Sequence, residues 1–255
     1  MAQAYATPDM QVPPEVYNQA ANYQLGELTG LYKPRFANAL MIVGIALGVT
    51  ILDIIVFLAI LIYGGYIFYI LIVIPIVALI WMFSALPYAN LRVYTFAQGL
   101  VHARGQAIDA VRWDQIEAVW AKATRSRNSI QYIYTVRRGG DGKTFTYRNH
   151  LQQVRNLGAT IQQRLVQAQM PRVIPAYNAG QNIAFGAVNV NMQGLNNGKE
   201  MVPWSEVGSI VNREGTLNIE KDGRLLPWKA IKVANVPNFA VLQALVQYVV
   251  KGPRD

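Results

Sequence analysis

The residues best suited to chemistry in this chain are cations between positions 122 and 148. Lysines and arginines recur there in segments that alternate apolar and polar residues, and acids are few. Near a cytoplasmic membrane leaflet, each such cation gains about 1 kcal/mol from anionic lipid. The pattern indicates a lipid- or partner-binding site, with a solvated positive surface as the alternative. The candidate residues are Lys122, Arg125, Arg127, Arg137, Arg138, Lys143 and Arg148.

Asp53 is the second candidate, because it is the one acid in an apolar run over residues 39–63. A carboxyl inside a membrane is costly, so it is either a proton or ion relay or a protonated acid that contacts a neighbouring helix or subunit. Gly44 and Gly48 form a small-xxx-small pair that lets another helix approach closely. Asp53 follows Gly44 by about 900° of helical rotation and lies on the opposite face. We predict all three as intramembrane contact residues.

Other chemistry has little support in the composition. The chain has no cysteine and two histidines, His102 and His150, so we expect no metal site, no thiolate chemistry and no cofactor. The run Gly139-Gly140-Asp141-Gly142 lacks the Lys-Ser/Thr of a phosphate loop and reads as a hairpin turn. We predict no catalytic residue, no enzyme activity and no nucleic-acid partner.

The elements that position these residues begin with two apolar runs, over residues 39–63 and 66–86, each long enough to span a bilayer. They are separated by Gly64-Gly65 and predict a two-helix transmembrane hairpin within residues 37–88. Lys33, Arg35 and Arg92 flank the runs, so the positive-inside rule puts both termini in the cytoplasm. The expected location is the cell (inner) membrane, as a multi-pass protein.

The remaining chain divides into a tail and a β-rich portion. Residues 1–36 predict a mobile tail with a short helix near residues 15–31. Alternating segments predict strands at residues 92–97, 100–104, 107–113, 116–124, 132–138 and 143–147. Asn149 can cap a helix that follows, and Pro171 and Pro175 then interrupt the chain.

An internal repeat organises the β-rich portion. Residues 112–119, Arg-Trp-Asp-Gln-Ile-Glu-Ala-Val, correspond to residues 203–210, Pro-Trp-Ser-Glu-Val-Gly-Ser-Ile. Gln-Gly-Leu precedes each copy, at 98–100 and 193–195, and a hairpin and a helix follow, the second helix entering at Pro237. We therefore expect two tandem domains, at residues 89–170 and 171–255.

Antiparallel strands sealed by one C-terminal amphipathic helix are the layout of a pleckstrin-homology-like (PH-like) or GRAM-like domain. The chain resembles a bacterial family of uncharacterised membrane proteins with tandem PH-like domains. Residues 25–28, Gly99-Leu100, residues 113–116 and 203–207, Asp222-Gly223 and Pro237-Asn238 carry the resemblance. The resemblance implies a fold class and a membrane location. The fold class is a membrane α-helical hairpin plus an α+β part, in which two PH-like domains are each closed by a C-terminal helix.

The function that these features predict is a membrane-anchored, non-enzymatic binding or scaffolding module. Its expected partners are the lipid bilayer, anionic lipid head groups, and a membrane protein or a second copy of the chain. Residues 88–171 carry twelve basic and four acidic side chains, most of the chain's net charge of +9. The alternative is an accessory subunit of a membrane transport or enzyme complex, with Asp53 as its intramembrane contact.

Overall fold

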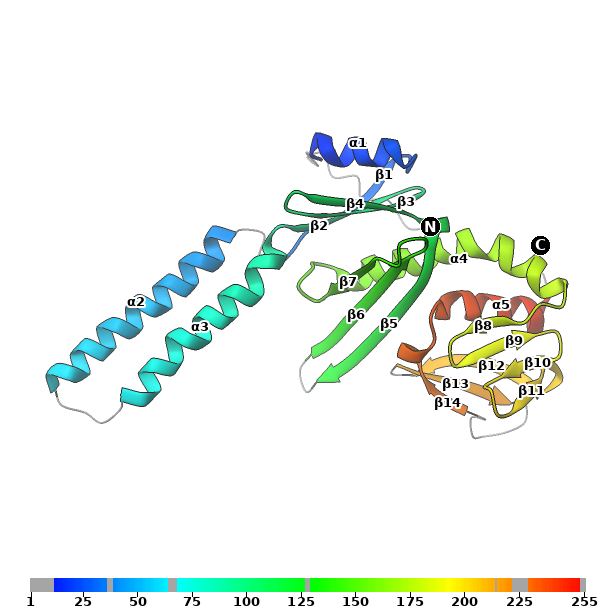
Figure 1. Ribbon diagram of the computed structural model, residues 1–255. Coiled ribbons are helices and arrows are strands. Elements are labelled where there is room, and N and C mark those ends of the chain that lie inside the picture. The colour runs from blue at the N-terminus through cyan, green and yellow to red at the C-terminus, as the bar shows by residue number, and fades with distance from the viewer. Residues whose placement is uncertain are drawn as a thin grey trace. The chain divides into compact units, whose positions relative to one another are not determined.

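The computed structural model describes residues 12–35, 39–63, 68–126, 129–213, 215–221 and 229–252. Its strands form four antiparallel sheets, in the orders β1-β2-β3-β4, β5-β6-β7, β11-β10-β9-β8 and β12-β13-β14 (Figure 1). Contacts divide the chain into two compact units. One comprises residues 1–97, 101–110 and 150–152, and the other residues 98–100, 111–149 and 153–255. The four-part division predicted from the sequence stays a prediction.

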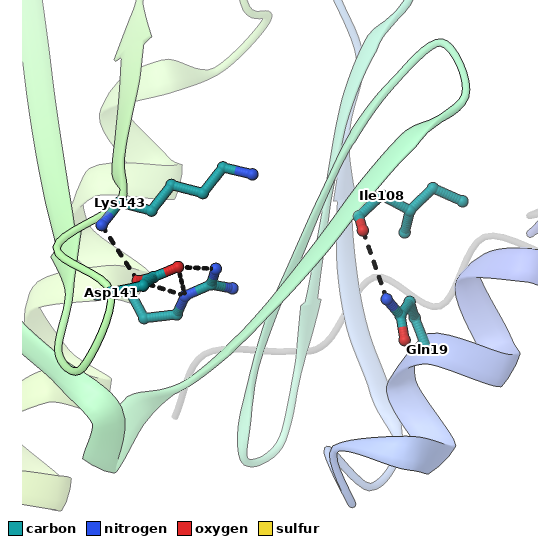
Figure 2. Close-up of polar contacts among 5 residues, drawn as sticks. Gln19, Ile108, Asp141 and Lys143 are labelled. Atoms are coloured by element: carbon teal, nitrogen blue, oxygen red, sulfur yellow. Dashed lines mark hydrogen bonds and ion pairs between the residues drawn. The ribbon is translucent and has the colours of Figure 1, made fainter.

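The sheet of the first unit is made by β1 (Leu28–Tyr32), β2 (Leu91–Phe96), β3 (Gly99–Arg104) and β4 (Ala107–Arg112). Helix α1 (Pro14–Asn22) packs its buried residues Val16 and Ala20 against this sheet, where Tyr94 and Phe96 are also buried. The side chain of Gln19 donates to the carbonyl oxygen of Ile108 at 3.4 Å (Figure 2). Residues 12–35, expected to be mostly mobile, therefore contain a helix and a strand that belong to a core.

Two long apolar helices, α2 (Ala39–Tyr63) and α3 (Phe68–Ala89), lie side by side in Figure 1. They interrupt the sheet, because β1 precedes them and β2 follows them. The two strands pair in antiparallel register, with Leu31 opposite Tyr94 and Tyr32 opposite Val93. The helices are thus an insertion within a β-sheet.

The fold class predicted from the sequence, a membrane α-helical hairpin followed by two tandem PH-like domains, is wrong. The described chain contains four antiparallel sheets, and the first of them begins before α2 and α3. In the described part, one segment, Met41–Ala59, is long and apolar enough to span a membrane. The sequence prediction failed because it placed all β-structure after residue 88 and treated the apolar runs as a separate N-terminal domain. Gly64-Gly65 lies outside the described residues.

The second unit contains the first three-stranded sheet and the helix that covers it. The 3-10 turn η1 (Trp113–Gln115) leads into β5 (Ile116–Ser126), β6 (Ser129–Arg138) and β7 (Thr144–Arg148). Helix α4 (Val154–Asn178) follows. Its residue Gly158 lies directly against the ring of Tyr134, where a Cβ atom would stand 2.0 Å from Cζ. A side chain at residue 158 would therefore hold α4 off the sheet.

The same order of elements then occurs again. Strands β8 (Ile183–Phe185), β9 (Val188–Asn191), β10 (Gly194–Asn196) and β11 (Met201–Pro203) form a four-stranded sheet. The turn η2 (Trp204–Glu206) leads into β12 (Val207–Arg213), β13 (Thr216–Lys221) and β14 (Lys229–Lys232). The turn η3 (Val233–Asn235) and helix α5 (Phe239–Lys251) close the copy. This order agrees with the internal repeat read from the sequence.

The strand predictions for residues 92–147 are confirmed to within a few residues by β2 to β7. Two local predictions are wrong. Asn149 does not cap a helix, because α4 begins at Val154 after Gln153. Pro171 and Pro175 do not end an element either, because both lie inside α4, which packs alongside α5.

Candidate functional site

The predicted cations gather on the sheet β5-β6-β7. Lys122 and Arg125 lie on β5, Arg137 and Arg138 at the end of β6, and Arg148 at the end of β7. Lys143 stands in the turn between β6 and β7, and Arg127 lies outside the described residues. The sheet therefore brings together residues that are up to 26 positions apart in the sequence.

The strand register sorts these cations between the two faces of the sheet. Residues directly opposite each other on neighbouring strands share a face. Lys122 is opposite Ile133, which is opposite Arg148, so all three lie in one row on one face. Tyr134, one residue on from Ile133, belongs to the other face and contacts α4. The outward face thus carries Lys122 and Arg148, and the alternation places Arg137 on it as well.

Arg137 is already engaged on this outward face. Its Nη2 donates to Oε1 of Glu117 at 2.6 Å, and its guanidinium lies over the ring of Trp120, 5.1 Å from the ring centre. The Arg137 and Glu117 side chains are 38% and 51% exposed. Glu117 is the extra residue of a β-bulge, where the register shifts between Ile116 and Ala118. The bulge aims the Glu117 carboxylate at Arg137 and offsets its charge.

Arg138 and Lys143 are engaged at the β6–β7 turn. Arg138 donates from Nε to Oδ1 of Asp141 at 3.0 Å and forms an ion pair through Nη2. The backbone N–H of Lys143 donates to the same Oδ1 at 3.1 Å (Figure 2). The hydrogen bond from Arg138 holds the pKa of the Asp141 carboxyl far below its usual range, and the Lys143 N–H acts in the same direction. Arg138 and Lys143 therefore stabilise the β6–β7 turn through Asp141.

Lys122 and Arg148 remain as exposed cations that have no ion pair with any described residue. With Ile133 between them, they form what we call the cation row. Neighbouring strands lie about 4.8 Å apart, so the two cationic residues stand roughly 10 Å from each other across β6. This spacing suits two separate anionic groups on a surface better than one compact anion.

The cation row is held in place by two asparagine side chains that the sequence interpretation did not assign to this role. Asn149 accepts from the N–H of Tyr132 at 2.7 Å and donates to the carbonyl of Ile130 at 2.8 Å, which extends β7 along β6. Asn238 accepts from Val119 N–H at 2.8 Å and donates to the carbonyl of Glu117 at 2.9 Å. The signal in the sequence is an asparagine shortly before each closing helix.

Two tyrosines, Tyr134 buried and Tyr132 half-buried, lie on the opposite face of the sheet. Burial raises the pKa of the Tyr134 hydroxyl, and the neighbouring Tyr132 adds to the rise while Arg155 opposes it. The rings of Tyr132 and Tyr134 stack in parallel with their centres 6.5 Å apart. Charge is therefore disfavoured on the α4 side, and a charged ligand has access on the outward face.

The second candidate site lies on α2. Asp53 is 9% exposed and shares a helix face with the buried residues Ile42 and Ala46, which lie at helical spacing from it. Gly44 and Gly48 are exposed, and a Cβ atom added at either would meet nothing within 4 Å. The opposite placement of acid and glycines agrees with the sequence argument. However, the face that is buried is that of Asp53.

No group of three or more His, Asp or Glu side chains within the described ranges could hold a metal ion. The model of one protein family, described as a family of unknown function, DUF6585, matches residues 1–255. The chain belongs to this DUF6585 family. Comparisons of this DUF6585 member with curated proteins and with solved structures found no match. The finer resemblance to bacterial proteins with PH-like domains stays a prediction.

Proposed function

We propose that this protein is a membrane-associated, non-enzymatic binding module that contacts anionic lipid head groups through the cation row. The observation that carries the proposal is that Lys122 and Arg148 lie on the same face of the sheet. Both are exposed, and neither has an ion pair in the described structure. Two other cations of this sheet are offset by acids, Arg137 by Glu117 and Arg138 by Asp141. Two uncompensated cations in one row are the arrangement expected where the compensating charge comes from a ligand.

The membrane part of the proposal rests on α2 and α3. Helix α2 contains the segment Met41–Ala59, which is long and apolar enough to span a bilayer. Large apolar side chains are exposed on both helices, and a contiguous surface of this kind marks contact with lipid or protein. Exposed examples are Ile51, Leu52, Ile54, Ile55, Leu58, Ile76, Val77, Ile80 and Phe83.

Anchoring makes weak head-group contacts sufficient. A site tethered to the bilayer meets lipid at a high local concentration, so binding becomes intramolecular. Each cation near an anionic surface contributes about 1 kcal/mol, and a high local concentration of lipid raises the occupancy of contacts of this strength. The cytoplasmic leaflet is the anionic surface that the proposal names.

The experiment uses the full chain in nanodiscs of neutral phosphatidylcholine, mixed with sucrose-loaded vesicles. We expect cosedimentation with vesicles that contain phosphatidylglycerol, loss of cosedimentation at high salt, and none with phosphatidylcholine vesicles. The double variant Lys122→Gln/Arg148→Gln should lose most of the binding. The matched control is Lys199→Gln/Arg164→Gln, which removes the same charge away from the cation row.

Equal cosedimentation with neutral and anionic vesicles would contradict the proposal. Equal losses in the two double variants would also contradict it, because net charge alone would then explain binding. Copurification of a protein that depends on Lys122 and Arg148, without lipid binding, would assign the cation row to a protein partner instead.

The alternative function, an accessory subunit of a membrane transport or enzyme complex, has one observation in its favour. The Oδ1 atom of Asp53 is buried and has no hydrogen-bond partner among the described residues. A membrane protein that copurifies with the wild-type chain but not with Asp53→Leu would support this function. Unchanged copurification in the variant would exclude Asp53 as the contact.

A further inference from the structure

The hairpin β5–β6 extends beyond the sheet to which it belongs. Strand β7 pairs with β6 from Arg137 to Ile133, while β5 and β6 continue together from Lys122 opposite Ile133 to Ser126 opposite Ser129. The two-stranded part, which we call the ribbon, comprises residues 123–126 and 129–132, with the pair Lys122–Ile133 at its base. Side chains 122–125 and 129–131 are exposed. The ribbon therefore adds almost no buried side chain to the core.

The second repeat shows that the fold does not require the ribbon. Its hairpin β12–β13 ends with Arg213 opposite Thr216, which is opposite Lys232 on β14. Counted from Trp113 and Trp204, this row occupies the same position as Lys122, Ile133 and Arg148. The β5–β6 hairpin of the first repeat thus continues for about four residue pairs beyond the position at which the β12–β13 hairpin turns.

The ribbon carries an apolar residue close to its end, between cations. Ile130 is 44% exposed and lies opposite Arg125, while Lys122 belongs to the other face of the ribbon. Asn149 binds the main chain at Tyr132 and Ile130, which keeps the ribbon extended up to this residue. An exposed apolar residue near the end of a held projection, with Arg125 beside it on one face and Lys122 behind it on the other, fits the boundary between head groups and acyl chains.

We propose that the ribbon is a second membrane contact, in which Ile130 enters the lipid interface while Lys122 and Arg125 reach the phosphates. This inference rests on the proposed function, because it takes an anionic bilayer as the ligand. The cation row lies three residues, roughly 10 Å, behind Ile130 along the strand. The head-group layer is about 5–7 Å thick, and long cationic side chains can cover the difference.

The test uses the absence of cysteine from the chain. The full-length variant Ile130→Cys carries an environment-sensitive fluorophore and is reconstituted into phosphatidylcholine vesicles, with or without phosphatidylglycerol. We expect a blue shift and a rise in emission in the anionic vesicles. Lys122→Gln in this background should lower the inserted-to-free ratio roughly five-fold, equivalent to about 1 kcal/mol.

The control is Met192→Cys, labelled in the same way. Met192 is an apolar residue, 57% exposed, that follows β9 in the second repeat. Point variants are preferable to deletion of the ribbon, because Gly215 lies close to the carbonyl oxygen of Ala123 and a deletion would disturb that packing. Unchanged thermal unfolding of each labelled variant confirms that the fold is intact.

Two results would overturn the inference: no shift at residue 130 in anionic vesicles, or an equal shift at residue 192. The cosedimentation experiment separates this failure from that of the proposed function. Binding that depends on Lys122 and Arg148 without a shift at residue 130 rejects only the insertion of the ribbon. Loss of both signals rejects the proposed function, and the insertion with it.

Discussion

The two three-stranded sheets share their construction, and both have cations in the corresponding row, Lys122 and Arg148 in the first and Arg213 and Lys232 in the second. They differ in one ion pair and in the ribbon. Each follows a turn that begins with a tryptophan. The backbone N–H of that tryptophan donates to a glutamine carbonyl, from Trp113 to Gln98 at 3.0 Å and from Trp204 to Gln193 at 3.3 Å. Each also has a bulge in its first strand, after Ile116 and after Val207. The shared features are those that build the fold.

The differences lie where the first sheet meets solvent. At the positions of Glu117 and Arg137 in the first sheet, the second has Gly208 and Glu220, so the ion pair occurs in only one copy. The ribbon is likewise confined to the first copy. Features that the duplicate omits are not needed for folding, which makes them the better candidates for function.

The closing helices differ as well. Tyr134 in the first sheet corresponds to Leu217 in the second, by the register of the two hairpins. Each helix follows a residue with a left-handed backbone conformation, Gln153 in the first repeat and Asn238 in the second. Counted from these residues, Gly158 and Gln243 occupy equivalent positions. In the first repeat, the large ring of Tyr134 is thus matched by a glycine on the closing helix. In the second repeat, the smaller Leu217 is matched by the longer Gln243.

The largest expected effect is that of Gly158→Ala. A Cβ atom there would lie 2.0 Å from Cζ of Tyr134, so α4 or the ring must move. We expect a loss of about 3 kcal/mol in the free energy of unfolding, the upper end for overpacking. Chemical denaturation followed by tryptophan fluorescence measures it.

The companion variants test whether the size of the strand residue and the size of the helix residue are coupled in each repeat. Adding Tyr134→Leu, the residue type found in the second repeat, should restore most of the loss, which gives a favourable coupling in a double-mutant cycle. Gln243→Ala should be nearly neutral. Additive losses in the double variant would refute the proposed link between ring and glycine.

Asn238→Ala should have the next largest effect. It removes two hydrogen bonds to β5 and leaves alanine at a φ of 54°, so we expect a loss of about 2 kcal/mol. Asn238→Gly avoids the backbone cost and isolates the hydrogen bonds. Asn149→Ala, at the more exposed ribbon, should cost less, and equal losses would show that the two asparagines do not differ in importance.

Trp204→Phe should cost about 1 kcal/mol, because it removes the hydrogen bond from Nε1 to the carbonyl of Asn191 at 2.9 Å. Phenylalanine keeps a ring near Tyr177, whose ring meets Trp204 edge-on at 6.3 Å. Hydrogen exchange of the amides in β9 and β10 should rise locally. Unchanged exchange would show that the indole N–H contributes nothing to the second repeat.

The smallest effect concerns pH at the β6–β7 turn. The pKa of Asp141 is lowered in the folded chain, so its ion pair with Arg138 contributes fully above about pH 4 and less as pH falls towards the folded pKa. Acidification should therefore lower the protection factors of the turn amides, after correction for the intrinsic pH dependence of exchange. Asp141→Asn should abolish the change, and a pH dependence that persists in this variant would assign it to another group.

Sequence patterns predicted the elements whose residues alternate and whose turns carry glycine. The strands from β2 to β7 and the turn at residues 139–142 belong to this class. Strand β1 was missed because five residues that contain Gly30 have no clear period, and their partner β2 lies beyond two helices. Pro171 and Pro175 misled because packing of α4 against α5 offsets the cost of about 3 kcal/mol that proline brings to a helix.

The candidate site was predicted only as a list of cations. Which of them share a face depends on register, and register depends on the bulge at Glu117, which no alternation of residue types reveals. The neutralised members were not distinguishable either. Asp141 follows Arg138 closely in sequence, whereas Glu117 and Arg137 meet only because the strands pair.

The insertion of α2 and α3 between β1 and β2 has a consequence for the order of folding. During synthesis, β1 leaves the ribosome long before its neighbour, because both helices must be made before Leu91 appears. Until then the apolar side chains of α1, such as Val16, have no sheet to cover. The N-terminal segment therefore stays uncovered until both helices have been made, and closure of this sheet reports their completion.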